Sequence, residues 1–216
     1  MMAWTEQLQT VGALPALGCL FGAYALGCFS TGYLLVRART GRDIREIESG
    51  SSGARNVGRV LGRTGFFLTF LGDALKGVLA VWVALHFTGS HLLAALAMLC
   101  VVAGHIWPVT LQGRGGKGAI TSLGALSVYD PHLVLAYFAV FLPGVALTRK
   151  SLLPGMTAYL CLPLVSYWLH RDPVESVLIA VLGALVIIAH RQNLLKEFSA
   201  LAARRGWWVK PQHTKP

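Results

Sequence analysis

Residues 77–113 read GVLAVWVALHFTGSHLLAALAMLCVVAGHIWPVTLQG and contain no Asp, Glu, Lys or Arg. Further uncharged runs cover residues 7–36, 131–148 and 151–170. A helix that crosses a bilayer needs about 20 mostly apolar residues, and several of these runs reach or approach that length. The chain of 216 residues is only 13% charged, whereas a soluble domain carries roughly 25% charged residues. The sequence therefore predicts an integral membrane protein, with a soluble all-helical core as the alternative.

We expect an all-α polytopic fold with about seven transmembrane helices and a short re-entrant or broken segment. The predicted spans are residues 11–36, 65–86, 90–106, 116–129, 132–148, 153–170 and 173–190. Strands are not expected, because the runs exceed the roughly 10-residue alternating segments of a membrane barrel. The linkers are too short for a second domain, so residues 1–216 are predicted to form a single domain with a short basic tail at about 191–216.

The basic residues predict how the chain is oriented in the membrane. Of the 19 Lys and Arg residues, 17 fall in the segments 37–64, 104–117, 149–152 and 191–216. The other two are Lys76, inside the second predicted span, and Arg171. Because cytoplasmic loops carry an excess of Lys and Arg, we expect an outside N-terminus and a cytoplasmic C-terminus. The net charge of +10 is then mainly a topology signal and needs no nucleic-acid partner, although a basic face also attracts anionic lipids and substrates.

Three polar segments interrupt the apolar pattern, and all of them fall on the predicted cytoplasmic side. They read SGSSGARNVGR (residues 49–59), GHIWPVTLQGRGGKGAITSLG (104–124) and HRQNLLKEF (190–198). Irregular backbone at membrane depth must be buried in protein or line a wet cavity. We therefore expect the three segments to meet at one site where the membrane borders water.

The second segment has the composition of an anion site. Four glycines surround Arg114 and Lys117 before an apolar run begins. Glycine lets backbone N–H groups approach a ligand, and a helix N-terminus adds partial positive charge. Arg and Lys then favour phosphate. The segment is not a nucleotide-binding P-loop, because Gly118 follows Lys117 at the position where that loop needs Ser or Thr. A flexible basic turn that reaches lipid headgroups is the alternative.

The first segment offers matching chemistry. Ser49 and Asn56 supply short hydrogen-bonding groups, and Arg55 and Arg59 supply forks that bind phosphate through two N–H groups. An ordinary polar loop between helices is the alternative.

The third segment places His190 and Asn193 three residues apart, so they share a helix face. A structural interfacial histidine is the alternative. Asp73 and Lys76 have the same spacing within the second predicted span. We expect them to form a structural ion pair that also shapes the site, because charges inside a membrane are costly unless paired or functional.

Together these segments resemble the bacterial membrane acyl-phosphate:glycerol-3-phosphate acyltransferases of the PlsY type. The resemblance extends from AYALGCFSTGYLLVRARTGRDIRE (residues 23–46) to HRQNLLKEF. Its specific parts are the serine–glycine stretch that ends in Asn56 and Arg59, the GHIWPV…GGKG segment, and the trio at residues 190, 191 and 193. The chain departs from the family pattern at Ser51, Arg55, Thr110, Ala200 and Ala202.

The resemblance implies transfer of a fatty acyl group from acyl phosphate to the 1-hydroxyl of glycerol 3-phosphate. The products would be lysophosphatidate and phosphate, made for phospholipid biosynthesis at the bacterial cytoplasmic membrane by a site that faces the cytoplasm. No metal or other cofactor is implied. Because acyl phosphate is already activated, no acyl-enzyme on Ser or Cys is needed. The site has to hold two anions, align the hydroxyl and stabilise the oxyanion.

Carried onto this chain, the resemblance and the residue chemistry predict two groups of site residues. The expected catalytic residues are His190, Asn193, Lys117, Ser49 and Arg59. The expected substrate- or phosphate-binding residues are Gly50, Gly53, Asn56, Gly104, His105, Arg114, Gly115, Gly116, Gly118, Ser151 and Arg191. We expect His190 to position substrate rather than to carry the proton, because the surrounding cations favour a neutral imidazole.

The expected partners are acyl phosphate, glycerol 3-phosphate and membrane lipids, with the chain acting as a monomer. The competing class is a transporter or channel for a phosphate-type anion, since transporters also bind anions at broken helices with glycine-rich loops. A paralogue that acylates another acceptor and a lipid-binding scaffold are the remaining alternatives.

Overall fold

The computed structural model describes residues 11–204, and every regular element within that range is helical. The expected all-α membrane fold is confirmed. The helices are α2 (Ala13–Cys28), α3 (Thr31–Thr40), α4 (Ala54–Thr88), α5 (His91–Ile106), α6 (Ala119–Tyr129), α7 (Pro131–Thr148), α8 (Leu152–His170), α9 (Pro173–Ala189) and α10 (Arg191–Arg204), with short 3₁₀ turns η1 (Ile44–Glu46) and η2 (Val109–Leu111). Our expectations for residues 1–10 and for the last basic residues, Arg205, Lys210 and Lys215, lie outside the described residues.

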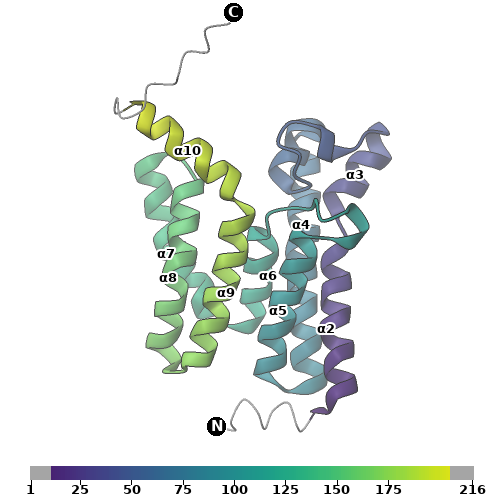
Figure 1. Ribbon diagram of the computed structural model, residues 1–216, viewed down its shortest axis with the longest axis vertical. Coiled ribbons are helices and arrows are strands. Elements are labelled where there is room, and N and C mark those ends of the chain that lie inside the picture. The colour runs from purple at the N-terminus through teal and green to yellow at the C-terminus, as the bar shows by residue number, and fades with distance from the viewer. Residues whose placement is uncertain (1–10, 205–216) are drawn as a thin grey trace, which may run out of the picture.

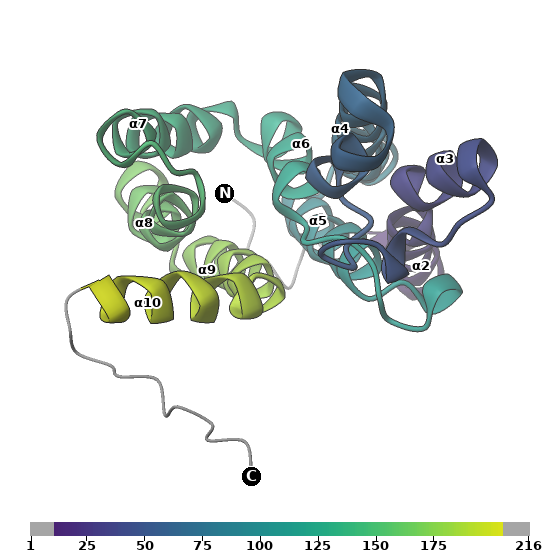
Figure 2. The same ribbon diagram turned by 90° about the horizontal axis from the view of Figure 1, so that it is seen from above.

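The helices form two neighbouring groups with α6 between them (Figures 1 and 2). One group contains α2 to α5, in which α2 packs on α5 and α4 packs on α5 and α6. The other contains α7, α8 and α9, which pack in succession. Buried apolar side chains from both groups belong to one cluster, which runs from Ala23 to Val186. The bundle therefore has a common core.

Apart from the breaks between α2 and α3 and between α9 and α10, successive helices alternate in direction, which gives the bundle two ends. One end, here called the α10 end, contains residues 41–53, 107–118, 149–151 and 190. The other, the far end, contains residues 89–90, 130 and 171–172. The α10 end is uppermost in Figure 1. All three polar segments of the sequence therefore begin or lie at the α10 end, whereas the orientation of this end in the membrane stays a prediction.

Five segments are long and apolar enough to cross a membrane, and there are six if α9 and α10, which are bent by 66° at His190, count as one. The five are Ala13–Thr40, Ala54–Thr88, His91–Leu111, Pro131–Thr148 and Leu152–His170. A helix occupies each of the seven predicted spans, but α6 has only 11 residues. At 1.5 Å per residue it is about 16 Å long, whereas the hydrocarbon core is about 30 Å thick. The count of seven full spans is not reached, and α6 corresponds to the predicted short segment.

The first span is broken between α2 and α3, and a buried lysine holds the break. Lys76 Nζ donates hydrogen bonds to the carbonyls of Gly27 (3.0 Å) and Phe29 (2.9 Å). The Thr110 hydroxyl donates to the Cys28 carbonyl at 3.1 Å. The last carbonyls of a helix lack partners within it, so these contacts satisfy groups that the break leaves unpaired. The predicted ion pair is present as well, with Asp73 Oδ1 3.3 Å from Lys76 Nζ and both side chains buried.

Helix α4 begins earlier than the sequence predicts. We expect a loop as far as residue 64, yet the helix starts at Ala54, with Gly53 as its N-cap residue and the Gly53 N–H bound to the Ser51 hydroxyl. The prediction of a loop up to residue 64 is wrong: glycines and arginines are typical of loops, but from Ala54 onward they lie in a helix. Only Gly62, at φ +69°, interrupts the helix.

Close packing holds α6 against α4. A Cβ added at Gly77 would lie 2.1 Å from the Thr121 carbonyl oxygen, and one at Gly124 would lie 2.2 Å from the Ala74 carbonyl oxygen. Small residues allow such close approach between membrane helices. This crossing fixes the start of α6 relative to α4.

Candidate functional site

The first two polar segments form one connected unit at the α10 end. The Ser52 N–H donates to the Gly115 carbonyl at 3.4 Å. Arg45 donates to the Leu111 carbonyl (2.9 Å), and Arg114 donates to the Arg45 carbonyl (3.2 Å). Arg114, a predicted phosphate-binding residue, therefore helps to join the two loops.

Lys117 lies at the centre of a group of basic side chains. Burial, and to a smaller extent the charges of Arg55, Lys196 and Arg59, lower the pKa of Lys117 to about 8. We call these four residues the cation cluster. Within residues 11–204, Lys117 makes no hydrogen bond or ion pair, and no carboxylate offsets the repulsion. Cations held together without an acid favour a bound anion.

His190 adjoins the cation cluster and is fixed in one orientation. It follows the last residue of α9, and its Nδ1 lies 2.8 Å from the Val186 carbonyl. Because a carbonyl only accepts, Nδ1 carries the proton and Nε2 keeps its lone pair in the neutral ring. Burial lowers the pKa of His190, and the charges of Lys117 and Arg55 also lower it. His190 therefore offers a hydrogen-bond acceptor beside several positive charges.

The three predicted segments do converge, through residues 55–59, 117 and 190–196. Of the other residues in the third segment, Asn193 is half-buried, and its side-chain amide has no hydrogen bond within the described range. Arg191 is exposed and donates to the Ile188 carbonyl at 3.2 Å. Ser49 is exposed too, and its N–H donates to Asn56 Oδ1 at 3.4 Å.

Two arginines of the cation cluster already contact other side chains. A bound phosphate would either displace these contacts or form in addition to them. Arg55 donates to the Ser151 hydroxyl at 2.7 Å, which links the first segment to the turn before α8. Arg59 lies 3.8 Å from Glu48, and both side chains are more than half exposed. Such exposed pairs contribute about 0–1 kcal/mol, so Arg59 remains available to a phosphate.

Several predicted binding residues instead shape the loops. Asn56 is 2% exposed, and its Nδ2 donates to the carbonyls of Ile47 (3.0 Å) and Ser51 (2.9 Å). Gly50 adopts φ +66°, which only glycine tolerates well, and its N–H donates to the Ile47 carbonyl. With Gly53 as the N-cap of α4, these residues form the turn that starts the helix.

Gly104 and His105 lie behind the site, inside the bundle. A Cβ at Gly104 would lie 2.3 Å from the Tyr24 carbonyl oxygen, so this glycine lets α2 approach α5. His105 is 5% exposed, and its Nδ1 lies 3.5 Å from Asp73 Oδ1. We therefore correct the expectation that these two residues contact phosphate. Asp73, Lys76 and His105 form what we call the inner cluster.

The sequence predicts that the glycines around Lys117 form a phosphate cradle, but their backbone N–H groups have other partners in the structure. The N–H groups of Gly115 and Gly116 donate to the carbonyls of Ile106 (3.1 Å) and His105 (3.0 Å). They cap α5 and are not free for a ligand, which corrects that expectation. Gly118, at φ +79°, is the N-cap residue of α6, whose first N–H groups add partial positive charge next to Lys117.

A groove of about 280 Å³ runs from the cation cluster along α4. Its lining is Arg55, Gly58, Arg59, Gly62, Arg63, Phe66 and Phe67. Arg55 and Arg59 are four residues apart and share one helix face. The chain bends at Gly62, so that Phe66 returns to Gly58, where an added Cβ would lie 3.0 Å from the Phe66 Cβ. Arg63 and the phenylalanines are absent from our predicted site, because the sequence does not reveal this bend.

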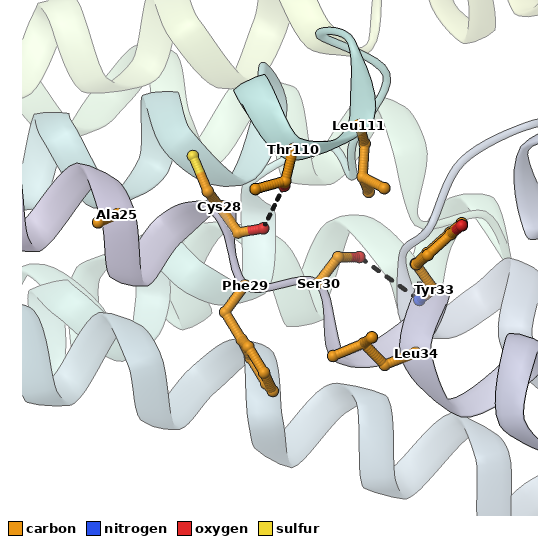
Figure 3. A pocket seen from close by; sticks show the side chains of 8 residues that line it. All are labelled: Ala25, Cys28, Phe29, Ser30, Tyr33, Leu34, Thr110 and Leu111. Carbon is orange, nitrogen blue, oxygen red and sulfur yellow. Dashed lines mark hydrogen bonds between the residues drawn. The ribbon is translucent and has the colours of Figure 1, made fainter.

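A second pocket, of about 320 Å³, lies at the break between α2 and α3 (Figure 3). Its lining is mostly apolar and includes Phe29, Tyr33 and Leu34. The Thr110–Cys28 and Ser30–Tyr33 hydrogen bonds cross its wall. This pocket contains no residue of the cation cluster, so its size does not make it the candidate site.

These features define a class: an integral membrane helical protein with a cluster of cations at one end of its bundle. Residues 17–200 match the family model described as glycerol-3-phosphate acyltransferase. The chain belongs to this family.

Known members resemble the chain over most of its length. A glycerol-3-phosphate acyltransferase 1 of Desulfitobacterium hafniense (strain Y51) is 45% identical over 186 residues, which cover 86% of this chain and 92% of the relative. A glycerol-3-phosphate acyltransferase of Clostridioides difficile (strain 630) is 41% identical over 177 residues, which cover 80% and 86%.

Two crystal structures of PlsY, an integral membrane glycerol 3-phosphate acyltransferase, superpose well on this chain. Their TM-scores are 0.78 for the glycerol 3-phosphate form and 0.75 for the lysophosphatidic acid form. Each is 32% identical to this chain, and each match covers 86% of this chain and 92% of the PlsY chain. The sequence-based resemblance to the PlsY type is confirmed.

Proposed function

We propose that this protein transfers a fatty acyl group from acyl phosphate to the 1-hydroxyl of glycerol 3-phosphate. The products are lysophosphatidate and phosphate, formed at the cytoplasmic face of a bacterial cytoplasmic membrane. Family membership supports the acceptor, because related PlsY structures exist in glycerol 3-phosphate and lysophosphatidic acid forms. The observation that carries the proposal is the cation cluster beside His190, in which Lys117 has no carboxylate partner within the described residues. Both proposed substrates carry phosphate, and the cluster can balance their charge.

The groove along α4 matches the shape of the donor. An acyl phosphate has a charged head and a long apolar chain, and the groove is lined by both arginines and phenylalanines. We propose that Arg55, Arg59 and Arg63 hold the donor phosphate while the acyl chain continues past Phe66 and Phe67 into lipid. Several of the apolar side chains around this part of α4, such as Leu68 and Leu71, are exposed, as expected of a surface that faces acyl chains.

The proposed reaction forms a C–O bond and breaks a C–O bond at the same carbonyl carbon. The 1-hydroxyl oxygen of glycerol 3-phosphate attacks, phosphate leaves, and the hydroxyl proton ends on a phosphate group or on His190. Lys117 and the N–H groups at the start of α6 stabilise negative charge in the transition state. Nε2 of His190 accepts a hydrogen bond from the attacking hydroxyl. Neither Ser nor Cys has to form an acyl-enzyme.

The direct test is a reconstituted assay. Purified protein in lipid should release phosphate and form lysophosphatidate only when acyl phosphate and glycerol 3-phosphate are both present. Acyl-CoA in place of acyl phosphate is the control and should give no product. Movement of labelled glycerol 3-phosphate into sealed vesicles without acylation would instead indicate the transporter class and would overturn the proposal.

A further inference from the structure

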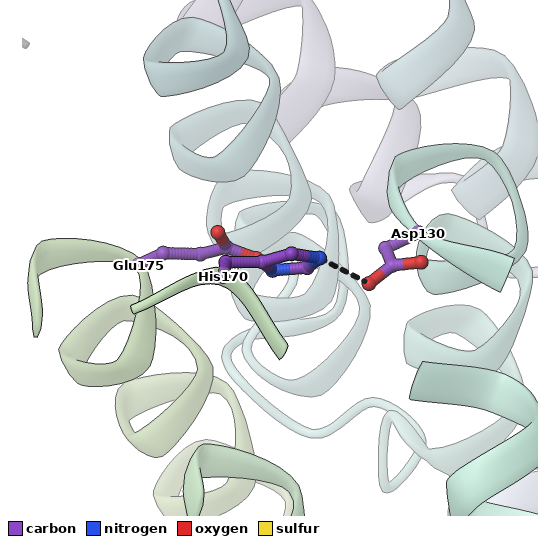
Figure 4. A group of neighbouring side chains, drawn as sticks. All are labelled: Asp130, His170 and Glu175. Atoms are coloured by element: carbon purple, nitrogen blue, oxygen red, sulfur yellow. Dashed lines mark hydrogen bonds and ion pairs between the residues drawn. The ribbon is translucent and has the colours of Figure 1, made fainter. Parts of the chain in front are cut away.

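The far end of the bundle contains a cluster of ionisable side chains that the proposed reaction does not use. Asp130 lies between α6 and α7, His170 in the last turn of α8, and Glu175 in the first turn of α9 (Figure 4). One candidate ligand atom from each residue lies within 4.8 Å of the other two. Glu175 and His190 are at opposite ends of α9, so this cluster is separate from the cation cluster.

The His170 ring lies between two carboxylates. Its Nδ1 is 3.0 Å from Glu175 Oε1, and its Nε2 is 3.4 Å from Asp130 Oδ2. A neutral imidazole has one N–H and one lone pair. When Nδ1–H donates to Glu175, the lone pair on Nε2 faces a carboxylate oxygen. That arrangement is repulsive unless Nε2 is protonated or a metal ion lies between the two atoms.

Asp130 provides an independent indication of a ligand. Its side chain is only 8% exposed, and its Oδ2 is buried without a hydrogen bond from any described residue. Its Oδ1, in contrast, accepts from the His132 N–H and lies 2.9 Å from His132 Nδ1. The carboxylate is therefore held by one oxygen, with the other directed at His170. A buried carboxylate oxygen left without a partner is costly.

No Lys or Arg among residues 11–204 neutralises this cluster. The described ion pairs of Asp130 and Glu175 are all with histidines. Arg171 follows His170 directly, but it is exposed and makes no ion pair within the described residues. Two carboxylates thus face a single imidazole, and a divalent cation would balance their charge.

We propose that Asp130, His170 and Glu175 bind a divalent transition-metal ion of the Zn²⁺ type. One imidazole nitrogen with carboxylate oxygens is a common donor set for Zn²⁺, whereas Mg²⁺ and Ca²⁺ prefer oxygen alone. Because the ligands come from three helix ends, the ion would hold the α6–α7 junction against α8 and α9. The role is structural.

The test uses full-length protein without a histidine tag, purified in detergent and stripped of metal with a chelator. ZnCl₂ or MgCl₂ is added back, and the midpoint of thermal unfolding and the bound metal are measured. We expect about one Zn²⁺ per chain and a midpoint that rises with Zn²⁺ concentration, because a ligand of the native state stabilises it. Mg²⁺ at the same concentration should give little shift.

Variants separate this site from other histidines. His170→Gln and Asp130→Asn should abolish the Zn²⁺-dependent shift, and Asn keeps the N-cap of α7, so that variant should still fold. Glu175→Gln provides a further test. His86→Gln is the matched control, since His86 is an exposed histidine in the last turn of α4 at the same end, and it should keep the full shift. Absence of bound Zn²⁺, an equal shift with Mg²⁺, or an unchanged shift in His170→Gln would each overturn the proposal.

Discussion

The inner cluster and the cation cluster each contain a central lysine, but only the lysine of the inner cluster has its charge balanced by other protein groups. In the inner cluster, Lys76 has a carboxylate within 3.3 Å and two carbonyl acceptors. In the cation cluster, Lys117 has only other cations for charged neighbours. His105 and Lys117 are both in the second polar segment, only 12 positions apart. The comparison teaches that a charge satisfied by protein holds the fold, whereas a charge left unsatisfied is available to a ligand.

The largest effect should come from the inner cluster and should appear as lost stability. Lys76→Met removes the cation that pairs with buried Asp73 and the donor to two carbonyls, and removal of one member of a buried pair costs about 3–5 kcal/mol. The yield and the thermal unfolding midpoint in detergent measure this change. The double variant Asp73→Asn/Lys76→Met should recover part of the loss. A stable single variant would show that the break between α2 and α3 needs no such pair.

Lys117→Met should give the reverse result, with little change in stability and a large loss of activity. Charge-assisted hydrogen bonds are worth about 1.5–3 kcal/mol, so kcat/KM for glycerol 3-phosphate should fall roughly 10- to 150-fold. The unfolding midpoint should stay level or rise, because a repelled cation has been removed. Lys117→Arg is the control that keeps the charge. If Lys117→Met unfolds more readily than wild type yet remains active, the two clusters do not differ as described.

His190→Gln should lower activity about 10- to 100-fold if His190 positions the hydroxyl, the cost of one hydrogen bond near charges. Gln keeps a hydrogen-bonding group, so some turnover should remain. The acidic limb of the pH–rate profile should also be unchanged. Complete loss of turnover together with loss of that limb would make His190 the general base, which typically contributes 10²–10⁴-fold.

The pKa of Lys117, lowered to about 8, predicts a pH effect. Below about pH 8 the free protein carries the charged ammonium, and above it the charge is lost. Activity as kcat/KM should therefore fall as pH rises through about 8, by up to about tenfold per unit. Lys117→Arg should abolish this limb.

Unlike kcat/KM, the stability of the folded protein should rise as pH rises above about 8. The folded pKa is below the unfolded value of 10.5, so the unfolded chain binds more protons between these values and the contribution to stability rises with pH. A midpoint that falls with pH in this window, specifically in wild type and not in Lys117→Met, would contradict the burial of Lys117.

The smallest effect is expected at Glu48, an acid that pairs with Arg59 of the cation cluster but is more than half exposed. Glu48→Gln frees Arg59 from a 3.8 Å pair worth about 0–1 kcal/mol. Affinity for glycerol 3-phosphate should rise by no more than about fivefold, with stability unchanged. Arg59→Ala is the paired measurement and should lower kcat/KM. A large loss in Glu48→Gln would mean that Glu48 itself contacts substrate.

The sequence predicted the membrane fold and the meeting of three segments because both follow from where charges are absent or present along the chain. It could not predict the start of α4, because Arg55, Arg59 and two glycines are typical of loops until their four-residue spacing is set on a helix. Nor could the sequence predict what the N–H groups of Gly115 and Gly116 bind. Whether their N–H groups are free depends on the end of α5, which the fold places beside them. His105 was misplaced for the same reason, since its buried partner, Asp73, is on another helix.

The short length of α6 has a consequence for where the proposed reaction takes place. Lys117 precedes a helix only about 16 Å long, and the other end of that helix is Asp130, so neither end reaches as far as the ends of its longer neighbours. The reacting carbonyl would then lie deeper than the ends of the longer helices. A donor already dissolved in the leaflet can reach that depth by lateral diffusion. Its product can leave in the same way, so the fatty chain never has to be extracted from the bilayer.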